Sequence, residues 1–247
     1  MPDPADRLLR ARADPTLAVL EGFHPLKHAL RFGAEILDAI SPDPAGLLAL
    51  AAALAPDVAP ALANLLREVT AEEFARSAPT PPPVPVLALA RRPATDPAAL
   101  LAAPGEAALV FLEHPNHLGN LGAVVRVAAA AGAAGVLASG DRDPWHPTAL
   151  RGSTGLHFAL PVARVEGLAS SHRPVVAADP DGPPLGEAVI PGRAILAFGS
   201  ERRGLSPDLL ARADLRVGIP MRAGVSSLNL ATAVAILLYA PGGRSHG

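Results

Sequence analysis

The sequence predicts an α/β protein whose C-terminal part holds a mostly parallel sheet, and two observations carry this prediction. In that part, short continuous apolar runs alternate with helix-like segments, and each run is bounded by Gly, Pro or Asp. Such strands are typical of a parallel sheet that is covered by helices on both faces. The chain of 247 residues is also 50% hydrophobic, which is enough to bury a large core and excludes a disordered chain.

The N-terminal third is expected to begin with a polar stretch and then to become helical. A first amphipathic helix, ending near Ser41, would place small and apolar residues on one face at Leu26, Leu30, Gly33 and Leu37. Two further helices rich in Ala and Leu are expected over residues 47–54 and 61–67. Thr70, followed three residues later by Glu73, predicts the N-terminal capping box of a short helix.

Two domains are expected, with a linker over residues 94–103, where Pro, Asp, Thr and Ala mix. A strand over residues 84–90 follows a proline cluster and closes the N-terminal domain, residues 1–93. The C-terminal domain, residues 104–247, holds the alternating segments. Its strands are expected over 108–112, 135–138, 175–178, 195–198 and 215–219. Its helices are expected over 121–131, 207–213 and 227–239.

Composition narrows the possible functions. The net charge of −2 argues against a broadly basic surface, so nucleic-acid binding would need a local cluster of arginines. The absence of cysteine excludes thiolate zinc sites and cysteine nucleophiles, and the eight histidines show no ligand-like spacing, so no metal is expected. The most apolar stretch, residues 228–240, is too short to span a bilayer, and the N-terminus has no apolar signal core. We therefore expect no membrane partner and a cytoplasmic location.

The segments that follow the predicted strands are the candidate site, because ligands of parallel sheets bind at the carboxyl ends of strands. The first segment spans residues 113–126. Asn120 is predicted to cap the following helix, and Arg126 would lie in its second turn, off the apolar stripe. Capping and solvation alone would explain both residues. The functional alternative is that both line one rim and hold an anionic group such as a phosphate.

The second segment spans residues 195–206, where Gly199 and Gly204 bracket a charged loop. A glycine directly after a buried strand lets a ligand approach the backbone closely. Ser206 is predicted to cap the helix that begins at Pro207. A plain surface loop is the alternative, and the segment carries neither a P-loop nor a GxGxxG fingerprint.

The third segment spans residues 217–229. Ser226 or Ser227 is predicted to cap the last helix. Asn229 would then be a polar residue in the first turn of an otherwise apolar helix, where a buried amide needs hydrogen-bond partners.

Taken together, the three segments resemble the SpoU (TrmH) branch of the SPOUT RNA methyltransferases. The first family motif, an Asn followed by Gly-Ala and an Arg, matches Asn120, Gly122, Ala123 and Arg126. The second motif matches Phe198, Gly199, Glu201, Gly204 and Leu205. The third motif matches Ile219, Pro220, Met221, Ser227, Leu228 and Asn229. The order and spacing of the motifs agree, and the likeness covers about residues 104–240.

Other parts of the chain carry a weaker likeness. Residues 151–155 resemble a secondary segment of the family. The N-terminal part is loosely similar to the small α/β RNA-binding domain that many members carry ahead of the catalytic domain. The chain departs from the family pattern at Val127, where Thr is common, and at Arg202, where glycine is common.

The resemblance implies a fold and an activity. The C-terminal domain would be a trefoil-knotted SPOUT domain that binds S-adenosylmethionine in the knot. The enzyme would act as a homodimer and transfer a methyl group to a ribose 2′-hydroxyl of RNA. The substrate would be ribosomal or transfer RNA, and the N-terminal extension favours ribosomal RNA. An RNA-binding protein that keeps the fold without turnover is the alternative, and an ordinary nucleotide-binding α/β enzyme is a third.

The resemblance also implies roles for individual residues. The catalytic set would be Asn120, Arg126, Glu201, Ser227 and Asn229. The cofactor would contact Leu196, Ala197, Phe198, Gly199, Ile219, Met221, Ser227 and Leu228. RNA would contact Arg126, Arg151, Arg202, Arg203 and Arg222. Arginine is a poor base because its pKa stays above about 12, so Arg126 is expected to hold phosphate and activate the hydroxyl electrostatically. Glu201 would orient Arg126 or Asn120.

Overall fold

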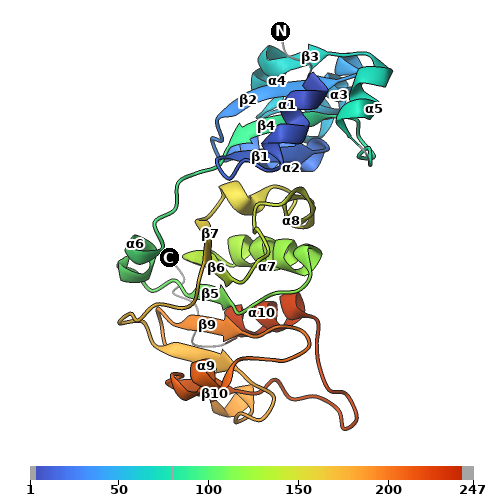
Figure 1. Cartoon of the computed structure of the whole chain (residues 1–247). Helices are drawn as coiled ribbons and strands as arrows, with labels where there is room; N and C mark the ends of the chain where they lie inside the picture. The colour runs from blue at the N-terminus through green and yellow to red at the C-terminus, as the bar shows by residue number, and fades with distance from the viewer. Residues whose placement is uncertain (1–3, 79, 241–247) are drawn as a thin grey trace. The chain divides into compact units, whose positions relative to one another are not determined.

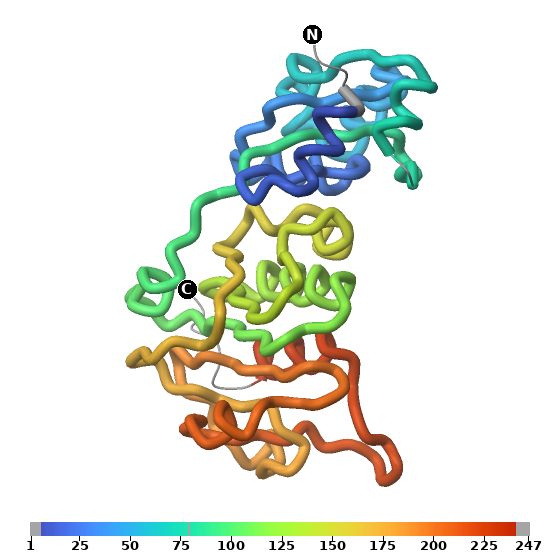
Figure 2. Tube along the Cα trace, in the orientation of Figure 1, coloured from blue at the N-terminus to red at the C-terminus, as the bar shows by residue number. Residues whose placement is uncertain are grey.

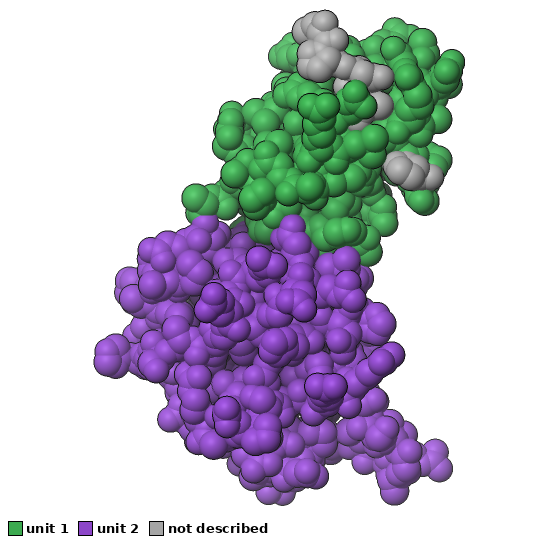
Figure 3. Space-filling view, viewed as in Figure 1, with its two compact units in different colours: residues 1–94, 145–159 green, residues 95–144, 160–247 purple. Residues whose placement is uncertain are grey.

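The computed structural model describes residues 4–78 and 80–240, which form two compact units. The first unit holds the described residues up to 94 together with residues 145–159, and the second holds residues 95–144 and those from 160 onward (Figure 3). The chain therefore passes between the units after residues 94, 144 and 159. Figure 2 shows the trace of the chain coloured by residue number. Residues 145–159 were expected within the C-terminal domain, but their contacts group them with the first unit.

The first unit is built on a four-stranded sheet with the order β1-β4-β2-β3 (Figure 1). Strand β4 pairs antiparallel with β1 and β2, and β2 pairs parallel with β3. The strands are β1 (Leu17–Glu21), β2 (Ile36–Ser41), β3 (Leu66–Glu68) and β4 (Leu87–Arg91). From the local residue pattern only β4 was expected, and the other three strands were missed. The small α/β domain that the family resemblance implies for this part of the chain agrees with the observed sheet and helices.

The first predicted helix shows why the local pattern missed a strand. Helix α2 (Phe23–Arg31) ends well before Ser41, and Ile36–Ser41 form β2. Gly33, with φ +74°, lies in the left-handed region that a continuing helix does not use. The third predicted helix also ends early, because α4 (Ala59–Leu65) gives way directly to β3.

The remaining helices of the first unit follow the capping signals. Helix α3 (Pro44–Leu54) begins after Asp43, whose side chain accepts from the Gly46 amide. Helix α5 (Ala71–Ser77) carries the predicted capping box of Thr70 and Glu73. Helix α1 (Pro4–Ala11) contributes to the core of this unit. That core joins apolar side chains of helices and strands, namely Leu8, Val19, Ile40, Phe74, Leu87 and Leu89.

The second unit contains a six-stranded sheet with the order β10-β8-β9-β5-β6-β7, and all its pairs are parallel. The strands are β5 (Leu109–Leu112), β6 (Gly135–Ser139), β7 (Val162–Val165), β8 (Val175–Ala178), β9 (Ile195–Phe198) and β10 (Leu215–Val217). The predicted parallel sheet is confirmed, although β7 was not predicted.

Helices cover both faces of this sheet (Figure 1). On one face, α6 (Pro97–Ala102) and α9 (Pro207–Ala211) pack Leu101 and Leu209 into a core with Phe111. On the other face, α7 (Leu118–Ala130) and α10 (Leu230–Leu238) pack against each other and contact β6 and β9. Helix α6 lies inside the expected linker, where Asp96 caps it. No helix in the described part of the chain combines the length and hydropathy needed to cross a membrane.

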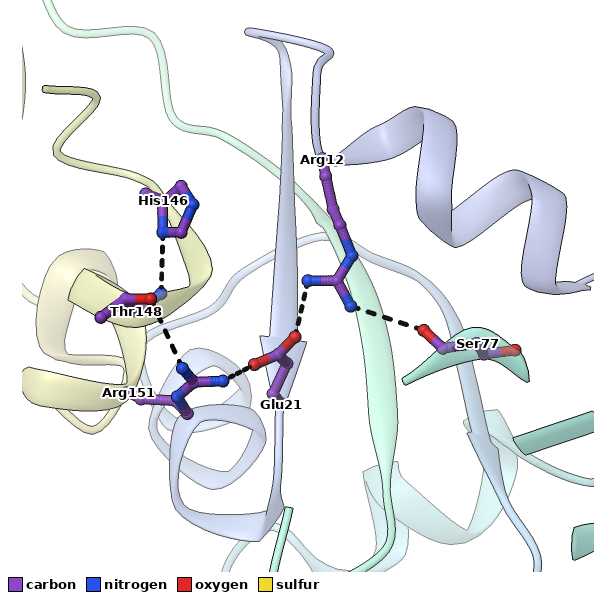
Figure 4. A network of polar contacts seen from close by, with 6 residues as sticks. All are labelled: Arg12, Glu21, Ser77, His146, Thr148 and Arg151. Atoms are coloured by element: carbon purple, nitrogen blue, oxygen red, sulfur yellow. Dashed lines mark hydrogen bonds and ion pairs between the residues drawn. The ribbon is translucent and has the colours of Figure 1, made fainter. Parts of the chain in front are cut away.

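Residues 145–159 are fixed in the first unit by a buried carboxylate (Figure 4). Helix α8 (Pro147–Gly152) lies beside β1, and the short helix η1 (Leu156–Phe158) beside α2. Glu21 is only 6% exposed and accepts from Arg12 at 2.6 Å and from Arg151 of α8. The His28 ring contacts the Thr154 carbonyl, with Nδ1 and O 2.6 Å apart.

We expect Glu21→Gln to lower the free energy of unfolding of the first unit by about 3 kcal/mol, because two guanidinium groups lose a buried counter-charge. Urea unfolding of the full chain, followed by Trp145 fluorescence, measures this unit because Trp145 is the single tryptophan. Arg91→Gln is the control, since the Arg91–Glu35 pair is more than half exposed and is expected to contribute at most about 1 kcal/mol. Equal effects of the two substitutions would contradict the prediction.

Candidate functional site

A cavity of about 270 Å³ opens at the carboxyl ends of β8, β9 and β10. Most of the residues predicted to contact the cofactor line it, namely Phe198, Gly199, Ile219, Met221, Ser227 and Leu228. Leu196 and Ala197 do not, because they are buried inside β9. The cavity also has a wall that the sequence did not indicate, formed by Asp179 and Pro180 after β8. Asp179 could have been predicted as a cavity residue, because it is a polar residue directly after a predicted strand and ligands bind at the carboxyl ends of such strands.

The loop after β9 closes tightly on itself. Ser200 and Gly204 exchange two backbone hydrogen bonds, 3.0 and 3.2 Å long. A Cβ atom added at Gly199 would lie 1.9 Å from the carbonyl carbon of Gly204 and 2.2 Å from the Leu205 nitrogen. The backbone of this loop, and not only an approaching ligand, therefore requires glycine at position 199. The predicted cap of the next helix is confirmed, because Ser206 accepts from the Leu209 amide.

Three side chains join the three predicted segments. The Asn120 amide donates to Oε1 of Glu201 at 2.9 Å, and its oxygen accepts from the amide of Asn229 at 3.0 Å. The backbone amide of Asn116 donates to Oε2 of Glu201 at 3.0 Å. The ends of β5, β9 and β10 are thus connected through one hydrogen-bonded chain, and both oxygens of Glu201 are used.

The two asparagines occupy different helical positions from those predicted. Asn120 does not cap α7, because the helix already begins at Leu118 with His117 as its N-cap. Asn229 is itself the N-cap of α10, and its Oδ1 accepts from the amides of Ala231 and Thr232. The prediction that Ser226 or Ser227 caps this helix was therefore wrong, and Asn229 is exposed, not buried. Both serines line the cavity instead.

The Glu201 carboxylate is held in its ionised form. Burial alone would raise the pKa of Glu201, but the hydrogen bonds from Asn120 and Asn116 outweigh burial and leave the pKa below its usual value. An ionised carboxylate only accepts hydrogen bonds, so it fixes the orientation of the Asn120 amide.

This pKa shift predicts how stability depends on pH. Because the folded pKa of Glu201 is lowered, its contribution is fully present above the unfolded value of about 4.3 and is lost as the pH falls through the folded value. We expect Glu201→Gln to be less destabilised than the wild type on going from pH 6 to pH 3, as measured by urea unfolding. The exposed Glu187→Gln is the control, and an equal pH dependence in both variants would contradict the prediction.

Arg126 is exposed on α7. Within residues 4–78 and 80–240, no group forms a hydrogen bond or ion pair with its guanidinium, and Glu201 orients Asn120 and not Arg126. The guanidinium is therefore available to a ligand.

The other predicted RNA contacts fall into two groups. Arg202 and Arg203 are exposed beside a second cavity, of about 570 Å³, which His114 and Asn116 also line. Arg222 is exposed in the loop before α10. Arg151 differs, because it belongs to the first unit and pairs with Glu21. The sequence offered no signal for this pair, since the two residues are 130 positions apart.

No group of three or more metal-ligating side chains occurs among the residues that the structure describes. The fold and site thus define a parallel α/β protein with a ligand cavity at the carboxyl ends of its strands and a polar chain of Asn120, Glu201 and Asn229 beside it. Residues 107–239 match the SpoU rRNA Methylase family, and because they are more than half of the sequence, the chain belongs to this family.

Individual relatives agree with this membership. The 23S rRNA (guanosine(2553)-2'-O)-methyltransferase RlmP of Bacillus subtilis is 36% identical over 129 residues, which are 49% of this chain and 52% of that protein. The matches span only 50% to 64% of the length of such relatives.

Solved structures share the whole fold. The SpoU methyltransferase AviRb from Streptomyces viridochromogenes, in complex with the cofactor AdoMet, has a TM-score of 0.77 at 23% identity, covering 95% of this chain and 96% of that one. A crystal structure described as an RNA 2'-O ribose methyltransferase has a TM-score of 0.73 at 29% identity, covering 96% and 92% of the two chains.

Proposed function

We propose that this chain transfers a methyl group from S-adenosylmethionine to a ribose 2′-hydroxyl of RNA. The observation that carries the proposal is the hydrogen-bonded chain Asn229–Asn120–Glu201, which joins the three family motifs beside the cavity. Family membership supports it, as does AviRb, a neighbour of the same fold that was solved with AdoMet.

The cavity residues fit this cofactor. Phe198, Ile219 and Leu228 offer apolar contacts for an adenine ring, next to the backbone groups of the loop after β9. The hydroxyls of Ser226 and Ser227 can bind polar groups of the ligand. The Glu201 carboxylate lines the same cavity and would offset a positive charge. When bound, S-adenosylmethionine supplies an activated methyl group on a sulfonium.

The residues of the chain would mainly position the acceptor. In-line displacement needs the ribose oxygen, the methyl carbon and the sulfur to be collinear, so most of the acceleration would come from orientation. The exposed guanidinium of Arg126 would hold an RNA phosphate and stabilise the 2′-oxygen as its proton passes to water. Asn120 and Asn229, fixed by Glu201, would hold the ribose edge.

Several finer features belong to the same proposal. We infer a homodimer in the cytoplasm, with ribosomal RNA as the favoured substrate and the first unit as an RNA-binding domain of about residues 1–93. The trefoil knot that the family resemblance implies for the second unit is part of the same proposal.

The test is a methyl-transfer assay with the full chain, methyl-labelled S-adenosylmethionine, and ribosomal and transfer RNA from a strain that lacks the gene. The expected result is labelled RNA, with one 2′-O-methyl position that is absent from the strain and restored by the protein. If the chain binds the cofactor and RNA but labels neither RNA, the silent RNA-binding alternative replaces the proposal.

RNA binding should depend strongly on salt. Arg126, Arg202, Arg203 and Arg222 are exposed and have no side-chain partner in the described structure. If all four contact phosphates of single-stranded RNA, the slope of log affinity against log salt is about −3. Fluorescence anisotropy between low and moderate salt measures it. We expect the slope of Arg202→Gln/Arg203→Gln to be less negative by about 1.4, whereas Arg212→Gln, next to α9, leaves it unchanged. A flat salt dependence would contradict the prediction.

A further inference from the structure

Arg173 is a buried cation whose guanidinium, among the described residues, binds backbone carbonyls alone. It is 3% exposed and donates to the carbonyl oxygens of Leu101, Ala103, Ala107 and Arg193. Arg193 donates to the same Ala103 oxygen, so two guanidinium groups converge on one acceptor, each at 3.2 Å. This carbonyl directly follows α6.

The two arginines lack a counter-charge. No carboxylate among the described residues lies within 4.0 Å of either guanidinium. Burial lowers the pKa of Arg173, and the charge of Arg193 lowers it further. A buried cation without a paired anion is costly, so an anion beside Arg193 would stabilise this arrangement.

Arg193 has two further unusual features. Its φ of +57° lies in the left-handed region, which is uncommon for residues other than glycine and often marks functional sites. Its Nε atom is buried and has no hydrogen-bond partner in the described structure. The turn before β9 therefore holds a strained arginine with an unused donor.

Arg193 lines a third cavity, of about 880 Å³, which is separate from the other two. The loop after β7 contributes further donors to it, namely Ser170, Ser171 and His172, and Arg164 lies in β7 itself. Two carboxylates also line it. Asp96 is used as the cap of α6, and Glu166 is exposed and forms no ion pair with Arg193.

We propose that this third cavity binds a phosphate group, with Arg193 as the central anchor and Arg164, His172 and the two serines around it. A phosphate on the cavity side of the Arg193 guanidinium would give the two converging guanidinium groups a counter-charge. The phosphate is either free in solution or part of an RNA strand, and both present the same oxygens. The site lies outside the donor cavity and goes beyond the proposed methyl transfer.

The experiment is calorimetric titration of the full chain with inorganic phosphate at constant ionic strength. We expect saturable binding with a dissociation constant of about 1 mM or tighter. Arg193→Asn tests the anchor, because asparagine tolerates a positive φ, and the loss of charge-assisted hydrogen bonds should weaken binding about 10- to 100-fold. Arg142→Gln is the control, because Arg142 is exposed and lies outside this cavity, and this variant should bind phosphate like the wild type.

A second variant and a second ligand complete the test. The side chain of His172 is exposed, so the His172→Ala variant is expected to fold normally and to bind phosphate more weakly. Competition by an RNA oligonucleotide would assign the phosphate to RNA, and its absence would assign it to the free ion. The proposal is overturned if the wild type shows no saturable binding, or if Arg193→Asn and His172→Ala both bind phosphate as the wild type does.

Discussion

Gly199→Ala is expected to abolish binding of S-adenosylmethionine and to lower the free energy of unfolding of the second unit by about 3 kcal/mol. The added methyl group would lie 1.9 Å from the backbone of Gly204. No side-chain rotation can relieve this contact, because the clashing atoms belong to the main chain. The loop after β9 must therefore open, and it forms part of the cavity wall.

Calorimetry of cofactor binding and urea unfolding monitored by circular dichroism measure the two effects. Gly186→Ala is the matched control in the same unit, since a Cβ atom there meets no atom within 4 Å and its φ is not positive. A Gly199→Ala protein that unfolds and binds the cofactor like the Gly186→Ala protein would show that the loop tolerates a side chain.

Arg126→Ala is expected to lower the rate of methyl transfer about 10²- to 10³-fold and to leave the dissociation constant of the cofactor unchanged. The reason is location: Arg126 is exposed on α7 and does not line the cavity. Its proposed contribution is made to the RNA phosphate and to the developing charge on the 2′-oxygen. Such an interaction is strongest in the transition state.

Single-turnover assays with saturating RNA separate this effect from weaker RNA binding. Arg126→Lys keeps the charge but loses the planar fork of donors, so it should retain an intermediate rate. Normal turnover by Arg126→Ala would remove this residue from the mechanism, and loss of cofactor binding would assign it a structural role instead.

The strands of the second unit were largely predictable because each is a short buried run between turn residues. Five of its six strands were expected within two residues of their observed ends. β7 was missed because its residues VARV include an exposed arginine, which breaks the apolar run. The convergence of the three segments was also predictable, since parallel strands end on one edge of the sheet.

The first unit was less predictable for a physical reason. Leu26, Leu30 and Leu37 have helical spacing, yet Leu37 lies in a strand, because its neighbours Ile36 and Asp38 pair with β4 and Leu37 sits at the bulge between them. Tertiary pairing overrides local periodicity in such short segments. The polar residues of the site show the same limit. Asn120 bonds to Glu201, 81 positions away, and Asn229 bonds to Asn120, 109 positions away, so the local sequence pattern did not reveal either hydrogen bond.

The membership of residues 145–159 in the first unit has a consequence for dissecting the protein. A fragment that starts at residue 95 would retain α8 and η1 but lack Glu21 and His28, the acceptor of Arg151 and the partner of Thr154. Gly155, which meets the backbone of Pro25, would be left without its neighbour. The two units therefore cannot be separated by a single cleavage of the chain. A chimera that exchanges the first unit with that of a relative must exchange residues 145–159 together with the N-terminal residues.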